Sequence, residues 1–524
     1  MPASSCLSLP EYLNQLRQDK SLLDIQRGIE KESLRVNDEG ALAETLHPRA
    51  FGSKLTHPSI TTDFGEAQLE FITGTHSSVD ACLDELDGIH RYASQVLDKE
   101  YLWPLSMPCM LGEEEDIHLA DYGNSNTAQI KSIYRRGLAN RYGRLMQIIS
   151  GIHYNFSFSD EFLQHHAERL GQEFSSEFIN DSYMHLIRNF RRYSWLLIYL
   201  FGASPAVCGT FVPSGQHRLL PLDEGSYYRP DATSLRMGPL GYQSEAQAEL
   251  YVTYNSLIEY LRTLRVALTD PYPRYTRLGV KRQGIYQQLT DSLLQIEAEF
   301  YSPIRPKRKA EDNERPFCAL HSRGIEWVEI RCLDIDPFVP YGVASDTLHF
   351  VDAFLLYCLI SQSPYDTKQD YLVLLKNQSI VVHDGGALPD LNMDLNNTVP
   401  MKDMIAPVLK DVMAVAEVMD EIYGDSDHVN AVQQQMDKVE NKKQRPATVL
   451  LEAMVEQQRT FSQYGLNLAK EHHRYFQANP LSDAELEGWA NKTEESLQAQ
   501  AKIESAESEP FDSYLMSYLE LPEV

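Results

Sequence analysis

Positive charge is scarce in this 524-residue sequence, in which 47 lysines and arginines stand against 75 aspartates and glutamates. The resulting formal net charge of -28 opposes nonspecific association with a nucleic-acid backbone or an anionic membrane surface. We therefore expect neither nucleic acid nor a membrane as a partner. An anionic substrate would need local arginines and a divalent cation to bind against this negative field.

Long apolar segments and paired cysteines are also missing. No run approaches the roughly 20 apolar residues of a membrane-spanning helix, and the opening stretch MPASSCLSLPEYLNQLRQDK contains no apolar signal core. The 7 cysteines are scattered, without a CxxC pair or a zinc-like cluster with histidine. Such spacing favours reduced thiols and a cytoplasmic location. The cysteines are Cys6, Cys82, Cys109, Cys208, Cys318, Cys332 and Cys358.

Common nucleotide-binding and metalloprotease motifs are absent as well. The sequence has no GxxxxGKS or GxxxxGKT loop, no GxGxxG fingerprint and no HExxH motif. These absences exclude a P-loop fold and an ordinary dinucleotide-binding fold. With 43% hydrophobic residues, the chain has the composition of a globular protein, and it is long enough to bury a large core.

The sequence does contain clear strand patterns. Alternating apolar and polar residues predict strands within 25–36, 62–73, 149–159 and 324–334. Gly28 interrupts the first of these stretches and predicts a break or bulge, so that residues 25–36 form a candidate strand pair.

Helical patterns separate these strands and dominate the end of the chain. Helices are expected over 182–202 and 245–270, and from about residue 401 onward the composition is typical of helices with few strand signals. The acidic stretch 481–510 predicts a loosely docked helix. We therefore predict an α+β fold with an antiparallel sheet, comprising a catalytic core (1–400) and a mainly helical C-terminal region (401–524) packed on it.

The predicted strands carry acidic and imidazole side chains on their polar faces. A polar face on one strand usually meets water, so each stretch alone is typical of a solvated surface. If the faces came together, the carboxylates would repel one another unless a cation neutralised them. Oxygen ligands with one imidazole suit Mg2+, or Mn2+, better than zinc. The polar residues of these faces are Glu30, Glu32, Asp63, Glu66, Glu70, His153, Asn155, Glu329 and Arg331.

Two further stretches supply positive charge and aromatic rings. SPIRPKR places Arg305, Lys307 and Arg308 beside two prolines, and ATSLRMGPLGYQS carries Arg236 and Tyr242 among small residues. The first stretch is equally typical of a basic surface loop, and the second of an ordinary turn. Arginine in a rigid loop would bind carboxylate or phosphate oxygens through two parallel hydrogen bonds.

Eight motifs follow one another between about residue 25 and residue 340: IQRGIEKESLRV, TTDFGEAQLEFITG, WPLSMPC, SGIHYNFS, YLFGASPAVC, ATSLRMGPLGY, YSPIRPKR and GIEWVEIRCLDIDPF. Together they resemble glutamate-cysteine ligase of the proteobacterial type. The resemblance implies a glutamine synthetase-like core, in which an antiparallel sheet curves into a funnel with helices outside. It is faint beyond about residue 400, so the C-terminal helices carry little of it.

The resemblance also implies a reaction. It is the ATP-dependent joining of the L-glutamate γ-carboxyl group to the amino group of L-cysteine, through a γ-glutamyl phosphate, as the first step of glutathione biosynthesis. The products are γ-glutamylcysteine, ADP and phosphate. The expected cofactor is Mg2+ or Mn2+, ATP is a co-substrate, and glutathione is expected as a feedback inhibitor.

Site residues are carried over from the same motifs. The resemblance implies a catalytic role for Arg331 at the transferring phosphoryl group, and a substrate-carboxylate anchor in Arg236. No protein thiol has a role in this chemistry, and Glu66 could equally orient a neighbour. The implied metal ligands are Glu30, Glu32, Asp63, Glu70, His153 and Glu329, and the remaining implied substrate-binding residues are Gln147, Tyr134, Tyr242 and Tyr301.

Three alternatives stay open from the sequence alone. A related carboxylate-amine ligase could use another amine acceptor on the same scaffold. A metal-dependent hydrolase could use clustered carboxylates and histidine to activate water, and it would turn over without ATP. An acidic interaction protein would have strand faces that are merely solvated, and ATP with Mg2+ would not stabilise it.

Overall fold

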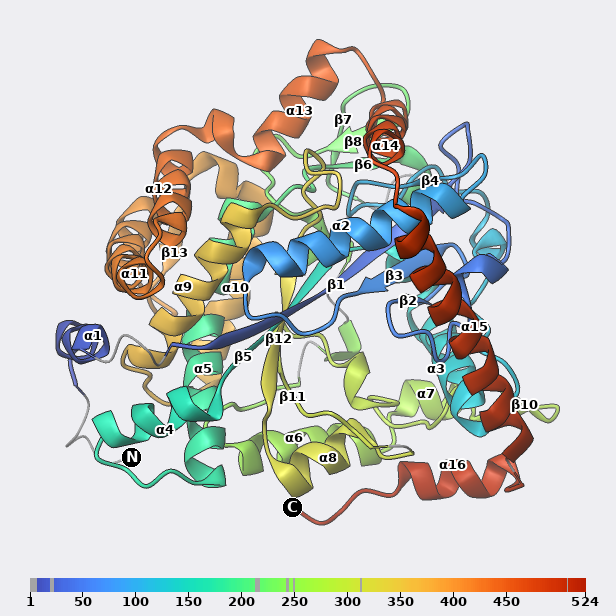
Figure 1. Cartoon of the computed structure of the whole chain (residues 1–524), viewed down its shortest axis with the longest axis horizontal. Helices are drawn as coiled ribbons and strands as arrows, with labels where there is room; N and C mark the ends of the chain where they lie inside the picture. The colour runs from blue at the N-terminus through green and yellow to red at the C-terminus, as the bar shows by residue number, and fades with distance from the viewer. Residues whose placement is uncertain are drawn as a thin grey trace.

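An antiparallel sheet lies at the centre of the molecule (Figure 1). The computed structural model describes residues 7–18, 23–212, 217–241, 245–247, 250–311, 313–506 and 508–524. The strands of the sheet are β1 (Ile25–Val36), β2 (Ile60–Thr62), β3 (Gln68–Ile72), β4 (Tyr101–Leu102), β5 (Ile152–Phe158), β11 (Ile304–Lys307) and β12 (Trp327–Leu333). Their order is β11-β12-β5-β1-β3-β2, and β4 pairs with the end of β1. The predicted α+β class with an antiparallel sheet is confirmed, whereas the funnel and the glutamine synthetase-like core remain predictions.

The long strand β1 holds the sheet together, because it pairs with β5 on one side and with β3 and β4 on the other. The predicted break at Gly28 is wrong. Gly28 pairs with Asn155 in an unbroken register, so residues 25–36 form one strand and not a strand pair. A Cβ atom at Gly28 would lie 3.3 Å from the carbonyl oxygen of Gly74, so glycine here permits two backbones to approach closely.

Three helices cover the apolar face of the sheet: α2 (Val79–Val96), α5 (Ser176–Phe201) and α9 (Ser345–Ile360). Helix α9 is apolar around its whole circumference, which is the pattern of a helix buried on all sides. Two charged residues that β1 directs to this side, Arg27 and Lys31, are both bonded to the covering helices. Arg27 pairs with Asp352 of α9 at 2.7 Å, and the Lys31 ammonium lies 2.7 Å from Nε2 of His90 in α2. The apolar face is therefore closed to solvent despite its charges.

The two predicted internal helices have different outcomes. The helix expected over 182–202 is α5, which begins earlier, at Ser176, where the hydroxyl of Ser175 caps it. The helix expected over 245–270 begins only at Leu257, as α6 (Leu257–Thr269), so the prediction is wrong for residues 250–256. Residues 245–247 form the 3-10 turn η6 (Glu245–Gln247), and residues 248–249 lie outside the described ranges. Ser256 caps α6, and residues 250–256 are non-helical, with the Tyr254 carbonyl accepting from Arg188 of α5 and the Asn255 amide donating to the Asp366 carbonyl.

The C-terminal part is helical, as predicted. Helices α11 (Met401–Tyr423) and α12 (Asp427–Glu440) pack on α9, and the acidic stretch forms α15 (Asp483–Ala506). Only Trp489 and Ser496 are buried in the described part of α15, and the Trp489 ring stacks on Tyr92 at 5.0 Å. Because one apolar cluster continues from β1 through α9 into α11 and α12, the division at residue 400 remains a prediction.

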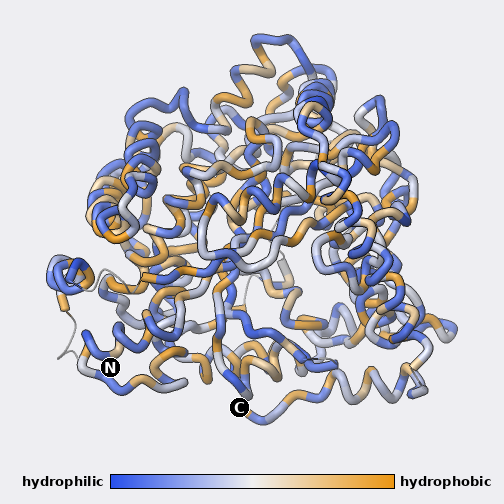
Figure 2. The backbone as a smooth tube through the Cα atoms, viewed as in Figure 1, coloured by the Kyte–Doolittle hydropathy of each residue, from blue (hydrophilic) through white to orange (hydrophobic). Residues whose placement is uncertain are grey.

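Shorter elements surround this core, and apolar and hydrophilic residues alternate along outer helices such as α11 (Figure 2). The remaining helices are α1 (Leu9–Gln18), α3 (Asn126–Tyr142), α4 (Asp160–Arg169), α7 (Pro273–Leu278), α8 (Pro316–Arg323), α10 (Lys368–Asp384), α13 (Pro446–Glu456), α14 (Phe461–Ala478) and α16 (Phe511–Leu519). The small sheets pair β6 (Ala206–Cys208) and β7 (Leu220–Pro221) with β8 (Ser226–Tyr228), β9 (Lys281–Arg282) with β10 (Ile285–Tyr286), and β13 (Asp390–Asn392) with β14 (Thr398–Pro400).

The cysteines are unpaired and the helices are too short or too polar to span a membrane in the described residues. Within the described ranges, no helix is long and apolar enough to cross a bilayer. Every cysteine in those ranges is free, and Cys109, Cys208 and Cys332 are buried. Burial raises the pKa of the Cys332 thiol to about 12, so it stays protonated and acts as a packing residue.

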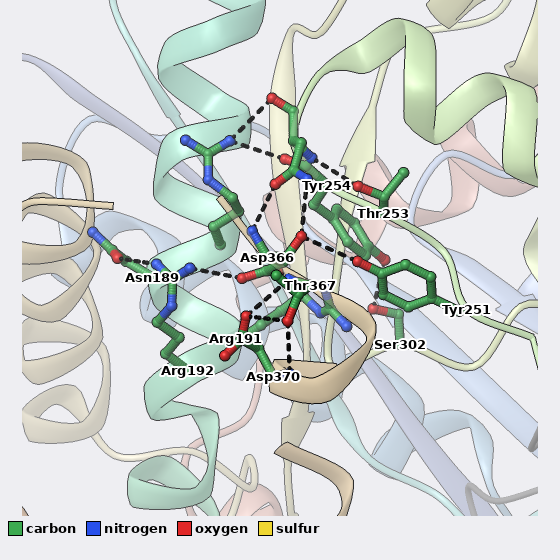
Figure 3. Close-up of polar contacts among 12 residues, drawn as sticks. Asn189, Arg191, Arg192, Tyr251, Thr253, Tyr254, Ser302, Asp366, Thr367 and Asp370 are labelled. Carbon is green, nitrogen blue, oxygen red and sulfur yellow. Dashed lines mark hydrogen bonds and ion pairs between the residues drawn. The ribbon is translucent and has the colours of Figure 1, made fainter. Parts of the chain in front are cut away.

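A buried polar network fixes the non-helical segment before α6 (Figure 3). Asp366, in the link between α9 and α10, pairs with Arg191 at 3.1 Å and Arg192 at 2.7 Å, both from α5. Its backbone N–H donates to the Asn255 side chain at 2.7 Å, and its carbonyl accepts from Tyr251 at 3.2 Å. One aspartate therefore joins α5, the α9–α10 link and the segment 250–256.

We expect Asp366→Asn to destabilise the protein by about 3 kcal/mol, because it removes a buried negative charge that balances two arginines. The matched control is Asp370→Asn, which alters an exposed capping contact to Thr367 at the start of α10 and should cost less than about 1 kcal/mol. Thermal unfolding of the three proteins measures the difference. Equal melting temperatures for the two variants would show that the Asp366 charge contributes no more to the stability of the protein than the exposed Asp370 contact.

Candidate active site

A cavity of about 310 Å³ opens on the polar face of the sheet. Its floor consists of side chains from β1, β3 and β5, and its walls come from α3, from segments 146–149 and 296–301, and from β11 and β12. Tyr518 of α16 also lines it, so a helix near the end of the sequence contributes to a site that is otherwise built by the first 331 residues.

The sheet register brings the predicted acidic residues together on the cavity floor. Glu30 of β1 lies directly opposite His153 of β5, and Glu32 lies directly opposite Glu70 of β3. Glu30 Oε2 is 3.4 Å from His153 Nδ1, and Glu32 Oε1 is 3.6 Å from His153 Nε2. One ligand atom from each of Glu30, Glu70 and His153 can be chosen so that all lie within 4.8 Å of one another. Asp63 lines the same cavity from the turn before β3.

Electrostatic repulsion in this cluster shows in the pKa values of its members. Burial, together with the Asp63 carboxylate, raises the pKa of Glu32 to about 8. Burial and the charge of Glu30 raise the pKa of Glu70 well above its ordinary value. Burial, with the nearby Arg331, lowers the pKa of His153, so its imidazole is neutral and can act as a ligand. The carboxylates therefore cannot all be ionised unless another positive charge is close.

The donor set fits a divalent cation such as Mg2+ or Mn2+. Its atoms are mostly carboxylate oxygens, the hard donors that these ions prefer, with one imidazole nitrogen beside them. His153 Nε2 and Glu329 Oε2 are buried, and neither has a hydrogen-bond partner within the described part of the chain. Unsatisfied buried donors and acceptors are rare in native proteins and mark places where an ion or ligand belongs.

Glu329 and Arg331 lie side by side on β12. Arg331 lines the cavity, and its Nη1 is 3.2 Å from Glu329 Oε1. Glu329 is buried beneath the cavity surface, where it also pairs with Lys307 at 3.4 Å and Arg305 at 3.9 Å. Although burial alone would raise it, the pKa of Glu329 is held well below its ordinary value by Lys307 and the neighbouring cations. Its assignment as a metal ligand remains a prediction.

The interpretation of SPIRPKR as a loop is wrong, because this stretch forms the edge strand β11. Proline is tolerated there, since an edge strand leaves one side unpaired. Arg305 lines the cavity and is 7% exposed, whereas Arg308 lies outside the cavity and pairs with Glu326 at 3.6 Å. Pairing with β12 therefore selects which of these cations reach the cavity.

The predicted substrate-binding residues divide into three groups. Gln147, Tyr134 and Tyr301 line the cavity, and the Gln147 amide donates to the Tyr301 hydroxyl at 3.3 Å. Arg236 does not line it. Its guanidinium lies behind the wall, where it donates to the Arg331 carbonyl at 2.9 Å and is 3.7 Å from Asp334. Tyr242 lies outside the described residues.

Glu66 is the one acidic residue from the predicted faces that does not join the cluster. Its carboxylate accepts from the backbone N–H groups of His47 at 3.2 Å and Asp121 at 2.9 Å, and it also pairs with Lys54. These contacts hold loops together, which agrees with the prediction that Glu66 could orient neighbours.

Several cavity residues were missed by sequence reasoning. Helix α3 directs Lys131 and Arg135 into the cavity together with Tyr134, and their i, i+3 and i+4 spacing in NTAQIKSIYRRGLANRY is a signal that could have found them. The contribution of Glu299 has no comparable local pattern, because a charged residue in a loop is common and its burial depends on tertiary contacts.

A pair of hydrogen bonds behind the cluster was missed as well. The Asn155 amide donates to Glu30 Oε1 at 2.9 Å, and the Trp327 indole N–H donates to Asn155 Oδ1 at 2.9 Å. Because the indole N–H bonds to the amide oxygen, the amide nitrogen of Asn155 must face Glu30. The hydrogen bond from that nitrogen then sets the orientation of the Glu30 carboxylate.

The sequence is similar to those of known proteins. Residues 11–381 match the profile of the glutamate-cysteine ligase family. The chain is 42% identical over 504 residues to a glutamate-cysteine ligase of Alcanivorax borkumensis, covering 95% of this chain and 96% of that protein. It is 44% identical over 497 residues to a glutamate-cysteine ligase of Bordetella petrii, covering 94% of this chain and 93% of that protein.

Solved structures agree with the sequence comparison. A glutamate-cysteine ligase of Francisella tularensis in complex with AMP matches with a TM-score of 0.88 at 36% identity, covering 95% of this chain and 98% of that chain. A bifunctional glutathione synthetase of Pasteurella multocida matches with a TM-score of 0.67 at 26% identity, covering 88% of this chain and 53% of that chain. The chain therefore belongs to the glutamate-cysteine ligase family, whose members are carboxylate-amine ligases.

Proposed function

We propose that this chain joins the γ-carboxyl group of L-glutamate to the amino group of L-cysteine at the expense of ATP, giving γ-glutamylcysteine, ADP and phosphate. The observation that carries the proposal is the cluster of Glu30, Glu70 and His153, with ligand atoms within 4.8 Å of one another in a cavity that Arg331 also lines. The AMP bound to the Francisella tularensis relative supports ATP as the co-substrate. Glutathione, the end product of the biosynthesis that this step would begin, is a proposed inhibitor.

The chemistry accounts for the residue types. A carboxylate is a poor acyl donor, because its oxygen is a poor leaving group. Transfer of the γ-phosphoryl group of ATP to a γ-carboxylate oxygen of glutamate gives γ-glutamyl phosphate and ADP. The cysteine amino nitrogen then attacks the acyl carbon, phosphate departs with the bonding electron pair, and the nitrogen loses a proton as the amide forms. Positioning and charge neutralisation provide most of the catalysis of phosphoryl transfer.

The cavity floor is the proposed place for the cation. Mg2+, or Mn2+ in its place, would supply positive charge against the anionic oxygens of ATP and glutamate. The carboxylates of the floor residues repel one another. When the cation is present, it therefore displaces the protons that these carboxylates would otherwise hold. The proposed ligands are Glu30, Glu32, Asp63, Glu70, His153 and Glu329.

Other residues are proposed to bind the substrates. Arg331 stabilises negative charge on the transferring phosphoryl group, and its ion pair with Glu329 holds the guanidinium in the wall. Tyr134, Gln147 and Tyr301 shape the amino acid pockets, together with Tyr242. The anchor role predicted for Arg236 would require its guanidinium to reach the cavity, which it does not line, and its contact with the Arg331 carbonyl supports the wall instead.

The direct test measures phosphate release and amide formation with ATP, L-glutamate and L-cysteine, with Mg2+ present or withheld. We expect product only when all four are present, and we expect cysteine to be used in preference to ammonia and other amino acids. Turnover without ATP would favour a metal-dependent hydrolase. A different preferred acceptor would identify a related ligase.

In the same assay, Arg331→Gln should lower kcat by about 100-fold or more, because the variant loses a positive charge at the phosphoryl group. The matched control is Arg308→Gln, directly after the neighbouring strand β11 and paired with Glu326 outside the cavity, which should retain turnover close to wild type. Melting temperatures should be similar for both variants. Near-normal turnover by Arg331→Gln would remove this residue from the mechanism.

Cation binding should depend on pH. Since the pKa of Glu32 is raised to about 8, the side chain holds a proton at pH 6 that a bound cation must displace. We expect Mg2+ affinity, measured by calorimetry, to rise between pH 6 and pH 8 by up to about tenfold per pH unit for each proton displaced. At pH 7 the heat should vary with the ionisation enthalpy of the buffer. An Mg2+ affinity that stays constant from pH 6 to pH 9 would contradict this cluster as the cation site.

The hydrogen bonds behind Glu30 make a separate prediction. Trp327→Phe keeps a ring but removes the N–H that orients Asn155, so we expect the Mg2+ concentration required for half-maximal rate to rise about tenfold. The control is Trp489→Phe, which changes a stacking contact on Tyr92 far from the cavity floor. An unchanged Mg2+ requirement in Trp327→Phe would mean that Glu30 is positioned without the indole.

A further inference from the structure

A second cavity of about 210 Å³ lies away from the sheet. It is enclosed by the C-terminal end of α5, by residues 230–233, by the turn η8 (Gly385–Ala387) and by the first turn of α13. It shares no lining residue with the cavity on the sheet. In Figure 1, α13 lies at the upper edge of the view, remote from β11 and β12. Nothing in the proposed reaction requires this second cavity.

A buried arginine lines the second cavity. Arg445 is 2% exposed, and its guanidinium lies over the Tyr199 ring, 5.0 Å from the centroid. It donates to the backbone carbonyls of Gly386 at 3.1 Å, Gly385 at 3.4 Å and Lys442 at 3.4 Å. The Asp231 carboxylate acts on it electrostatically, but no carboxylate of the described residues forms an ion pair with it. A buried cation without an anionic partner is costly, because the protein interior screens its charge poorly. This arrangement favours an anion in the adjoining space.

The Tyr199 hydroxyl provides independent support for a ligand. Tyr199 is 1% exposed and lines the cavity, and its buried hydroxyl has no hydrogen-bond partner among the residues that the structure describes. A buried hydroxyl without a partner loses its hydrogen bonds to water and gains none in return. A ligand oxygen in the cavity would satisfy this donor.

The first turn of α13 adds further positive potential. No side chain caps this 11-residue helix, and its first position is Pro446, which has no N–H group. Ala447 and Thr448 of the same turn line the cavity, as does the exposed ammonium-bearing side chain of Lys442. The Ala447 N–H donates to the Gly202 carbonyl at 3.1 Å, so this turn contributes through its aligned peptide dipoles, which attract negative charge at a helix N-terminus.

Two acidic residues, Asp231 and Glu452, also line the cavity, but neither pairs with Arg445. They disfavour a large polyanion that would fill the whole space. We infer that this cavity binds a small anion with one phosphate or carboxylate group, held by Arg445, Tyr199, Lys442 and the first turn of α13. The same donors serve either oxyanion, so the two chemical classes require parallel measurements.

The test is equilibrium dialysis of the full chain against labelled inorganic phosphate, with labelled acetate in a parallel series. Both series use the Arg331→Gln background, so that anion binding in the catalytic cavity is weakened independently. We expect one saturable class of site for at least one of these anions. Arg445→Gln should weaken its affinity by about tenfold or more, as expected for a lost charge-assisted hydrogen bond.

Two milder variants keep the test decisive if Arg445→Gln fails to fold, because that arginine also bonds to Gly385 and Gly386. Lys442→Gln and Tyr199→Phe leave those backbone contacts in place, and each should weaken binding several-fold. The matched control is Lys443→Gln, which makes the same charge change at a neighbouring exposed residue that does not line the cavity. The inference is overturned if neither anion binds saturably, or if Lys442→Gln and Tyr199→Phe bind as tightly as Lys443→Gln.

Discussion

Repulsion between carboxylates on one sheet face is the constraint on which the catalytic cavity depends. Glu32 and Glu70 lie directly opposite each other on adjacent strands, where like charges destabilise a sheet. The pairing persists because the carboxylates can hold protons, as the raised pKa values of both residues indicate. A cation that replaces these protons removes the repulsion and leaves the oxygens in place. The same unfavourable pairing therefore explains both the proton affinity of the cavity and its suitability for Mg2+.

The opposite face of the sheet makes this arrangement rigid. Arg27 and Lys31 alternate with Glu30 and Glu32 along β1, and each is held by a helix packed on the apolar side, through Asp352 and His90 respectively. A one-residue slip of β1 would exchange the two faces, placing carboxylates in the apolar core and removing them from the cavity. Buried contacts on one side thus fix the register that places the acidic side chains on the other.

The strands and their polar faces could be predicted from the sequence, because the alternation of apolar and polar residues is a local pattern within each stretch. It could not place residues whose position depends on distant contacts. Arg305 is drawn into the cavity by pairing with β12, whereas Arg308, only three positions away, is not. Arg236 was assigned to the substrate pocket but lies behind its wall, since Gly151 has no side chain and its ideal Cβ would come 2.0 Å from the guanidinium. Gly28 was interpreted as a break because glycine alone does not distinguish a bend from a close backbone approach.

Charge within the catalytic cavity is divided between floor and walls, and this division constrains how a nucleotide can bind. Glu30, Glu32, Asp63 and Glu70 occupy the floor, whereas Lys131, Arg135, Arg305 and Arg331 line the walls together with a single carboxylate, that of Glu299. A triphosphate without a cation would be attracted by the walls but repelled by the floor, in a chain whose net charge of -28 already opposes anions. Under the proposed function, a divalent ion held by the floor would offset that repulsion. Cation and nucleotide affinities would then be coupled, each binding better when the other is present.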